Sequence, residues 1–546
     1  MPQVTVIGAG IAGLAATLRL VERGFDVTLF EEDAFLGGKL GAHNHTDHKA
    51  DYHEHSFHMY LNWYHNFWQI VDELGIRAHF TAQPGMVYLK RDHYAVDAHK
   101  PELINVGAIG STWHNIFSGV QSPTDMFLYG YSLVDLLGSS VWPLRDLDRT
   151  SVFDFFESRP YLTDGAMALH GQTLAKAFAS PTYLTDAQSY RQFIGYGFRQ
   201  PDPMMWLLRG NTQQYLFDPL RRHLEKLAAA RKTVLRIEKL QRVDKLKLER
   251  DEVGKHRKIT GLWVSTLLQS PTIDVGGEPE VDGTRFEALS GDVILAVPPQ
   301  ALSRLLDAEM FTAAPELGYV RKLRSQPMAS LDVYFKRKLQ NVPTPITLCL
   351  DSPFGLTFLD TSQLWSEGSS QATSLNVTMS DYRIFARYKS AEEIATIKEY
   401  LFSELRHYIE FRYDPAGKDD DIDRSRCHLQ TNVGEELFTN EVGSWEFRPE
   451  TTCQIPNLFI AGDYCKTPVD VVTIEGAVVS GLLAAEAVRK RAAVGDPIRI
   501  IAPDVYPEPA LAALKLAGMP YAYAAKGWSM LYGAFQQGVR DIFPNG

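Results

Sequence analysis

The chain has 546 residues, enough for several domains' worth of buried core. With 45% apolar, 22% charged and 11% aromatic residues, its composition is that of an ordinary globular protein and excludes a disordered, collagen-like or disulfide-rich chain. A formal net charge of -11 gives no general attraction to phosphate backbones, so we expect no nucleic-acid partner.

The four cysteines form no CxxC motif, so the sequence indicates neither a zinc ribbon nor a disulfide framework. Met1 and Pro2 lead directly into an apolar run, without the basic region and cleavage site of a secretory signal. We therefore expect a cytoplasmic protein, with peripheral attachment to a membrane as an option.

The N-terminal segment predicts a β-α-β unit. Residues 4–7 and 26–30 predict strands, and the GxGxxG turn at residues 8–13 opens a helix that ends near Arg23. In such a turn Gly8 makes the tight bend, Gly10 lets backbone amides approach a pyrophosphate, and Gly13 lets the helix pack on the strand. The unit therefore predicts a dinucleotide site.

Charged residues after the second strand fit the same ligand. Glu31 offers a carboxylate to ribose hydroxyls and disfavours a 2′-phosphate. We expect neighbouring contacts from Glu32 and, within the first turn, from Ala12. A second glycine turn, Gly37-Gly38-Lys39, brings a cation that can meet the pyrophosphate from the other side.

Near the other end of the chain, residues 457–463 predict a buried strand that ends in Gly462-Asp463, and Thr473-Ile474-Glu475-Gly476-Ala477 opens a helix through Val488. Together with the first turn, this pairing resembles the family of FAD-dependent amine oxidases and carotenoid desaturases. The resemblance implies that Gly462 and Asp463 meet the ribityl and pyrophosphate region of FAD. It also implies that the helix beginning at Thr473, with Ile474 and Ala477, points its N-terminus at the isoalloxazine, where negative charge develops on reduction.

The resemblance narrows to plant- and cyanobacterial-type phytoene and zeta-carotene desaturases. Residues 54–60 resemble the family segment that follows the second glycine turn, with His58 on the family's histidine and Ser56 in place of its usual glycine. Further landmarks follow in the same order through most of the chain. Residues 234–243 predict a strand that returns to the nucleotide domain, where Leu240 holds the position that packs on adenine.

These observations predict an α/β protein. A Rossmann-type FAD-binding domain is expected from residues 1–80, 210–300 and 440–495, interleaved with an α+β substrate domain from 81–209 and 301–439 that carries apolar, membrane-facing helices. Residues 244–290 are expected to form a surface hairpin.

Two apolar segments are candidates for contact with a membrane. Residues 126–144 are interrupted by Asp135 and Pro143, so we expect a buried or membrane-dipping segment rather than a spanning helix. The tail 496–546 carries Trp528, Met530 and Phe535 and predicts either an interfacial helix or one that packs back on the body.

Seven histidines lie between His43 and His65, including HxH pairs that can bind a metal on a strand. No cysteine or tight carboxylate set completes a site, so we expect no metal. His58 is the candidate catalytic residue, as a proton acceptor beside the flavin or, alternatively, as a packed histidine. Cys465 is expected to be a buried small side chain rather than an attachment point, so FAD should be non-covalent.

Amine oxidases of this fold place a lysine near flavin N5 on the strand that matches residues 328–335, and the matching residue here is Ser330. Amine oxidation is therefore disfavoured. No second GxGxxG follows Gly13, so we expect electrons to pass to a quinone, oxygen or another protein rather than to a built-in NAD(P)H domain.

The expected function is an FAD-dependent oxidoreductase, a desaturase that removes hydride from an allylic C–H of a large apolar substrate such as an isoprenoid or carotenoid-like polyene. The alternatives are a redox-neutral isomerase or dehydroxylase acting on a lipid, a flavin amine oxidase, and an FAD-binding, membrane-associated protein without activity.

Overall fold

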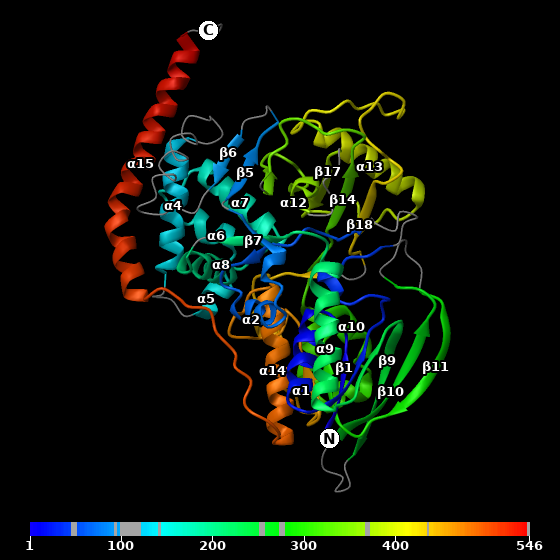
Figure 1. The fold of residues 1–546 in the computed structure, drawn as a ribbon. Coiled ribbons are helices and arrows are strands. Elements are labelled where there is room, and N and C mark those ends of the chain that lie inside the picture. Colours follow the sequence, from blue (N-terminus) through cyan, green and yellow to red (C-terminus); the bar gives the residue numbers. More distant parts are fainter. Residues whose placement is uncertain are drawn as a thin grey trace.

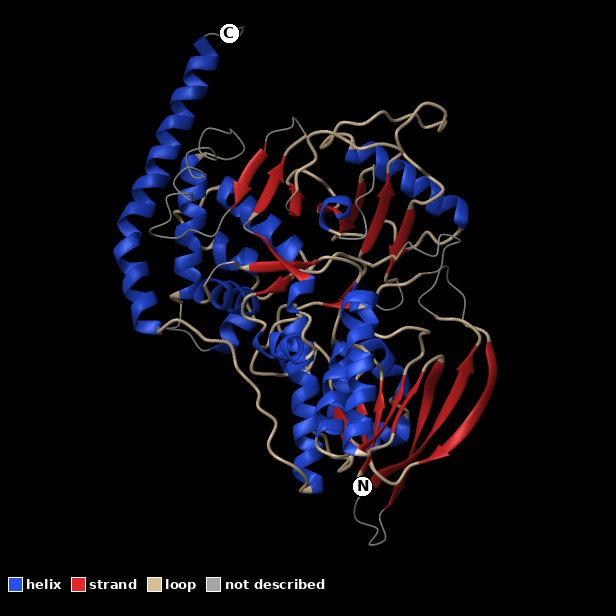
Figure 2. Ribbon diagram, viewed as in Figure 1, coloured by secondary structure: helices blue, strands red, loops and turns tan. Residues whose placement is uncertain are grey.

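The computed structural model describes residues 1–44, 52–83, 85–91, 95–98, 122–139, 144–201, 203–250, 257–271, 279–344, 346–365, 372–433 and 436–542. Within them a parallel sheet and its helices occupy one end of the molecule, a mixed sheet the opposite end, and a helical layer one side (Figures 1 and 2).

A parallel sheet of five strands forms the nucleotide half of the molecule, in the order β20-β12-β1-β2-β8. Its strands are β1 (Gln3–Ile7), β2 (Asp26–Phe30), β8 (Leu235–Glu238), β12 (Asp292–Leu295) and β20 (Leu458–Ile460). Its central strands are almost wholly apolar because both faces are covered. The α/β fold of Rossmann type is confirmed.

One face of this sheet packs against α1 (Ile11–Glu22), α9 (Asp218–Arg231) and α14 (Ile474–Ala492). The other face packs against an antiparallel sheet of β9 (Gln241–Arg250), β10 (Arg257–Leu267) and β11 (Val281–Ala288), together with α10 (Pro299–Leu305). The arrangement is visible in Figure 1.

The antiparallel sheet corrects two sequence-based predictions. Residues 234–243 are not one strand, because the chain leaves the parallel sheet after β8, turns at Leu240 with φ +56°, and enters β9. Within 244–290, the described residues belong mainly to the three-stranded sheet β9-β10-β11 and do not form an isolated surface hairpin. Alternate apolar residues of β9 and β10, such as Leu246 and Leu262, are buried against the parallel sheet.

The opposite half contains a seven-stranded mixed sheet in the order β18-β14-β17-β16-β15-β5-β6, covered by α13 (Ala391–Leu405). Its strands are β5 (Met86–Leu89), β6 (Ala95–Ala98), β14 (Ala329–Tyr334), β15 (Ile346–Cys349), β16 (Leu356–Asp360), β17 (Ser374–Met379) and β18 (His428–Thr431). A smaller antiparallel sheet consists of β3 (Tyr60–Leu61), β7 (Met205–Leu208) and β4 (Phe80–Gln83).

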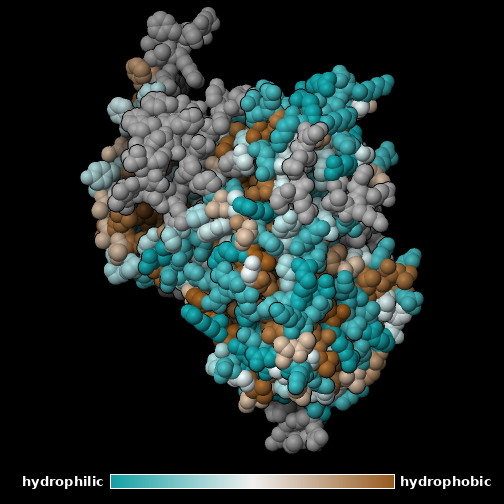
Figure 3. All heavy atoms as spheres, in the orientation of Figure 1, coloured by the Kyte–Doolittle hydropathy of each residue, from teal (hydrophilic) through white to brown (hydrophobic). Residues whose placement is uncertain are grey.

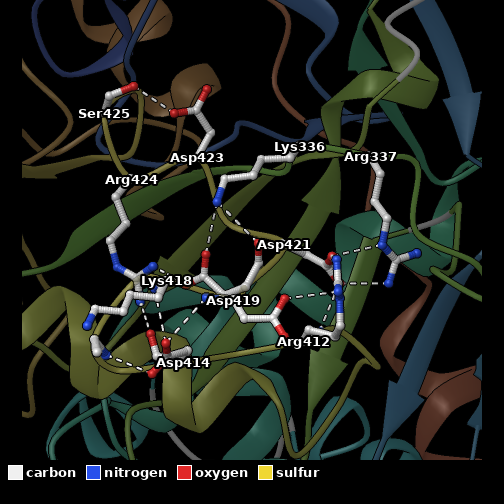
Figure 4. Close-up of polar contacts among 12 residues, drawn as sticks. Lys336, Arg337, Arg412, Asp414, Lys418, Asp419, Asp421, Asp423, Arg424 and Ser425 are labelled. Carbon is white, nitrogen blue, oxygen red and sulfur yellow. Dashed lines mark hydrogen bonds and ion pairs between the residues drawn. The ribbon is translucent and has the colours of Figure 1, made fainter.

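Ion pairs fix the loop between α13 and β18 (Figure 4). Asp421 is buried and accepts hydrogen bonds from the side chains of Arg337 (2.7 and 2.9 Å) and Arg412 (3.1 and 3.2 Å). These bonds, that from Arg337 foremost, hold the pKa of Asp421 well below its ordinary value. The loop is thereby tied to the end of β14, so we regard this cluster as structural.

The helical layer contains α4 (Pro123–Leu137), α5 (Leu144–Asp148), α6 (Val152–Glu157), α7 (Asp164–Phe178), α8 (Ala187–Arg199) and, at its outer edge, α15 (Glu508–Ile542). The apolar segment predicted at 126–144 is mostly α4, which ends before Gly138 and packs against α7, α8 and α15. Among the helices in the described ranges, none combines the length and hydropathy needed to cross a bilayer.

Candidate functional site

The first glycine turn contains two glycines that the fold requires and one that it does not. A Cβ on Gly8, at φ +98°, would lie 2.4 Å from the carbonyl oxygen of Ala296, and one on Gly13 would lie 2.0 Å from that of Gly8. Gly10 has an ordinary φ of -65°, and its Cβ would meet only the Gly37 carbonyl oxygen at 4.0 Å. The space at Gly10, at the N-terminus of α1, therefore suits a phosphate group of a ligand.

The second glycine turn lies directly on the first. Gly37 donates its amide to the carbonyl of Ala9 (2.9 Å) and pairs with Gly10 in a short parallel bridge. A Cβ on Gly38 would lie 3.2 Å from Cα of Gly10. Lys39 follows at once and donates to the carbonyl of Glu436 (2.9 Å). The Lys39 ammonium is thereby anchored at Glu436, and its contact with a pyrophosphate stays a prediction.

Glu31 lies at the end of β2 and braces the glycine turn. Its carboxylate accepts hydrogen bonds from the amides of Ala9 (2.6 Å) and Asp33 (3.0 Å). Burial and then Asp33 raise its pKa well above the ordinary value. Leu240 donates its amide to the Asp33 carbonyl (3.2 Å), which brings Leu240 to the same end of β2. Glu32, which lies between Glu31 and Asp33 in the sequence, is half-buried.

The C-terminal elements meet the N-terminal ones here. Burial raises the pKa of Asp463, while the charges of Lys39 and Arg448 oppose that rise, so Asp463 and Lys39 share one environment. Gly462 donates its amide to the hydroxyl of Ser480 (2.8 Å) in α14. A Cβ on Gly481 of α14 would lie 2.1 Å from the Ala12 carbonyl, so α1 and α14 cross in direct contact and Ala12 also has a packing role.

The N-terminus of α14 begins with a side-chain cap. The hydroxyl of Thr473 accepts a hydrogen bond from the amide of Gly476 (3.1 Å) as a helix cap. Ile474 and Ala477, one turn apart, share a partly exposed face of this first turn. The glycine turns, the Gly-Asp pair and two helix N-termini are thus adjacent, and these residues fit a dinucleotide.

Two positioning residues were not predicted from the sequence. Glu475 is fully buried and accepts hydrogen bonds from the amides of Asn66 (2.8 Å) and Phe67 (2.9 Å), at the start of α2 (His65–Glu73). Burial raises its pKa to about 7. Arg448, also buried, donates to the carbonyls of Tyr464 (3.1 Å) and Cys465 (2.7 Å). It thereby fixes the loop after Gly462-Asp463.

A cavity adjoins the segment that contains His58. Its apolar walls come from the aromatic residues of segment 52–60, from β7 and β16, and from α12 (Thr361–Leu364), with Trp365 after it. Polar side chains in its lining are those of Glu54, His58, Thr212, Asp332, Thr361 and Asn376. The cavity therefore combines a mainly apolar wall with two carboxylates.

The first carboxylate forms a pair with His58. Nδ1 of His58 donates to Oε2 of Glu54 (3.3 Å), and the amide of Thr212 donates to Oε1 (2.9 Å). Because an ionised carboxylate only accepts hydrogen bonds, Nε2 is the ring nitrogen of His58 that can take a proton from a ligand. This geometry permits the catalytic role predicted for His58.

The second carboxylate, that of Asp332 in β14, was not predicted. Nδ1 of His53 donates to Oδ2 of Asp332 (2.7 Å), and the side-chain amide Nδ2 of Asn376 donates to Oδ1 (2.7 Å). Ser330 lies two residues earlier on the same strand and is fully buried. The alternation Ser330, Asp332 on one face of a strand is a signal that sequence reasoning could have used.

Other predicted residues are placed as follows. His55 lies beside His58, with ring centroids 5.3 Å apart, and burial and then the charges of His58 and Lys39 hold its pKa well below the ordinary value. His55 therefore stands between the cavity and the second glycine turn. Among the described residues no three side chains gather as a metal site, while His45 and His48 lie outside them. Burial raises the pKa of the Cys465 thiol.

A model of the family described as flavin containing amine oxidoreductase matches residues 11–489. The chain is 23% identical over 510 residues to a zeta-carotene desaturase of Synechocystis sp., covering 89% of this chain and 97% of that protein. It is 22% identical over 507 residues to a 15-cis-phytoene desaturase of Synechococcus elongatus, covering 90% and 96%. A triple mutant of a putrescine oxidase shares the fold with a TM-score of 0.60 at 15% identity, covering 90% and 99%.

Proposed function

The chain belongs to the flavin-containing amine oxidoreductase family and is a flavin-dependent oxidoreductase; from this premise we propose that it binds FAD non-covalently and desaturates a large apolar polyene. The reaction would remove hydride from an allylic C–H of an isoprenoid or carotenoid-like substrate and a proton from the neighbouring carbon. The observation that carries this proposal is the cavity itself, which joins apolar walls to the His58–Glu54 pair.

The residues that would hold FAD are those at Gly10, Gly38-Lys39, Glu31, Gly462-Asp463 and the start of α14. When bound, FAD supplies the hydride acceptor. The protein supplies alignment: the apolar walls exclude water and orient the chain of the substrate, and Nε2 of His58 receives the proton. Glu54 keeps the proton on Nδ1 and stabilises the charged imidazolium that results.

Asp332 would act as an electrostatic partner in the same step. Loss of hydride from an allylic carbon leaves positive charge on the substrate, and a fixed carboxylate in a cavity of low dielectric stabilises such charge more than water would. Amine oxidation is the weaker candidate because Ser330, not a lysine, holds the matching position on β14.

The proposed partners follow from this chemistry. An apolar polyene dissolves in lipid, so we propose that the protein associates peripherally with a membrane to reach it. We further propose a quinone or oxygen as the electron acceptor.

The test is anaerobic mixing of the purified flavoprotein with a polyene substrate such as zeta-carotene or phytoene. Bleaching of the flavin absorbance that persists until an acceptor is added supports desaturation. Product formation without lasting bleaching would instead support a redox-neutral isomerase or dehydroxylase. Bleaching by small amines and not by polyenes would overturn the proposal in favour of an amine oxidase.

A further inference from the structure

The lysine side chains of helix α15 face the body of the protein and not the solvent, the reverse of an ordinary surface helix. Between residues 509 and 535, where side chains are described, Lys515 and Lys526 are the only charged residues. Nζ of Lys515 lies 2.7 Å from the buried carboxylate of Asp135 in α4, and Nζ of Lys526 donates to the carbonyl of Leu162 (2.7 Å). Both lysines therefore face the body of the protein.

Specific packing holds this inner face in place. Ala522 is fully buried, and a Cβ on Gly518 would lie 2.7 Å from the ring of Tyr131 in α4. The hydroxyl of Tyr131 donates to the carbonyl of Lys515 (3.0 Å). Since the inner face is fixed by these contacts, the direction of the outer face is fixed as well.

The outer face is apolar and aromatic. Nine large side chains on it are exposed by 48% to 70%, among them Leu514, Leu516, Tyr521, Trp528, Leu531 and Phe535. At about 100° per residue, these side chains span roughly 200° of the helix. In Figure 1, α15 forms the outer edge of the molecule, and tan and brown atoms appear along that edge in Figure 3.

We propose that the outer face of α15 lies in the headgroup and acyl boundary of a lipid bilayer. The apolar outer face covers a much wider part of the helix surface than the narrow seam by which two helices pair. This width disfavours a second copy of this chain as the partner that covers the face. Tyrosine and tryptophan are the side chains suited to a membrane–water interface, where the ring is apolar and its tip is wet. The protein body takes the place of the polar face that an interfacial helix normally has.

Two further features favour the interface over the hydrocarbon core. Pro520 lies on the exposed side of α15 and has no N–H to donate to the backbone carbonyl one turn earlier. Water and lipid headgroups can supply a hydrogen bond to that carbonyl, but lipid tails cannot. Without charge on this face, and with a net charge of -11 on the chain, attraction to anionic lipid cannot be the driving force. Binding should therefore resist salt.

This inference deepens the proposed function and rests on it for the choice of lipid over protein as the occupant. The test is flotation with vesicles of zwitterionic, net-neutral phosphatidylcholine at low and high salt. Wild-type holoprotein should float under both conditions. The triple variant Leu516→Glu, Trp528→Glu, Leu531→Glu should float at less than a tenth of that extent. Leu268→Glu, a control for an added carboxylate at an equally exposed leucine (58%) directly after β10, should float as wild type does.

Equal flotation of the triple variant and the wild type, or no flotation of either, would overturn the assignment. So would a concentration-dependent dimer in sedimentation that the triple variant loses, because that result assigns the face to a second copy. Far-ultraviolet circular dichroism and FAD content must match between variants. Oxidation of a polyene delivered by cyclodextrin reports the proposed function separately, and it should be unchanged in the triple variant.

Discussion

Gly10 offers a perturbation that separates ligand binding from folding. In Gly10→Ala the new Cβ meets nothing in the protein closer than 4.0 Å, and the φ of -65° suits any residue. Because alanine restricts the unfolded chain more than glycine does, the apoprotein should be as stable as wild type or more stable by about 0.4–1 kcal/mol. The substitution should therefore weaken the binding of FAD without lowering the stability of the apoprotein.

The expected loss of affinity follows from the hydrogen bonds at the pyrophosphate. A methyl group at Gly10 would hold the ligand away from the amides of the turn and the start of α1. Two hydrogen bonds to a charged group, at about 1.5–3 kcal/mol each, amount to about 3–6 kcal/mol. At 1.4 kcal/mol per factor of ten this is roughly a 10²- to 10⁴-fold weaker Kd. Gly10→Val should lose at least as much.

The assay is a titration of apoprotein with FAD, followed by flavin fluorescence, beside urea unfolding of the same apoprotein. Gly13→Ala is the contrasting variant, because its Cβ would lie 2.0 Å from a backbone oxygen, so the apoprotein itself should be destabilised. If Gly10→Ala is stable and binds FAD within threefold of wild type, the pyrophosphate does not lie at Gly10. If it unfolds as easily as Gly13→Ala, the glycine serves the fold and the reasoning fails.

Three further predictions concern protons and electrons. His58→Ala should lower polyene turnover by roughly 10²- to 10⁴-fold at matched FAD occupancy; a rate within a few-fold would leave His58 a packing residue. The folded pKa of Glu475, about 7, exceeds its ordinary 4.5, so the folded state binds more protons between these values. Apoprotein stability should therefore fall as pH rises from 5 to 8, by up to about 3 kcal/mol from this group, in urea unfolding. A Glu475→Gln variant with the same pH slope would exclude Glu475 as the cause. In stopped-flow mixing, NADH and NADPH should leave the flavin oxidised for minutes; bleaching within seconds would refute the inference drawn from the single GxGxxG.

The sequence determined the nucleotide half of the fold, because its signals are local. Strand, glycine turn and helix follow one another within residues 3–22, and each is set by the sterics of glycine and the period of apolar residues. The start of α14 was predictable for the same reason, since Thr473 caps the helix three residues before its partner amide. Family resemblance supplied the rest, by joining elements more than 400 residues apart.

Predictions failed where the same local pattern suits two tertiary arrangements. Residues 234–243 have the alternation of a strand, and nothing local shows that the chain changes sheet at Leu240. Likewise, the charged and glycine-rich composition of residues 244–290 is typical of a surface hairpin. The sequence does not show that the parallel sheet buries one face of β9 and β10.

Only the tertiary structure decided which charged groups meet. The pairs His53–Asp332 and Lys515–Asp135 join residues 279 and 380 positions apart, and no periodicity links their members. In α15 the sequence gives an apolar helix with two lysines, but the direction of its outer face depends on where Asp135 lies. Local sequence limits backbone conformation and burial. Contacts between distant side chains depend on how the elements pack, and that decides which carboxylate a lysine or histidine can reach.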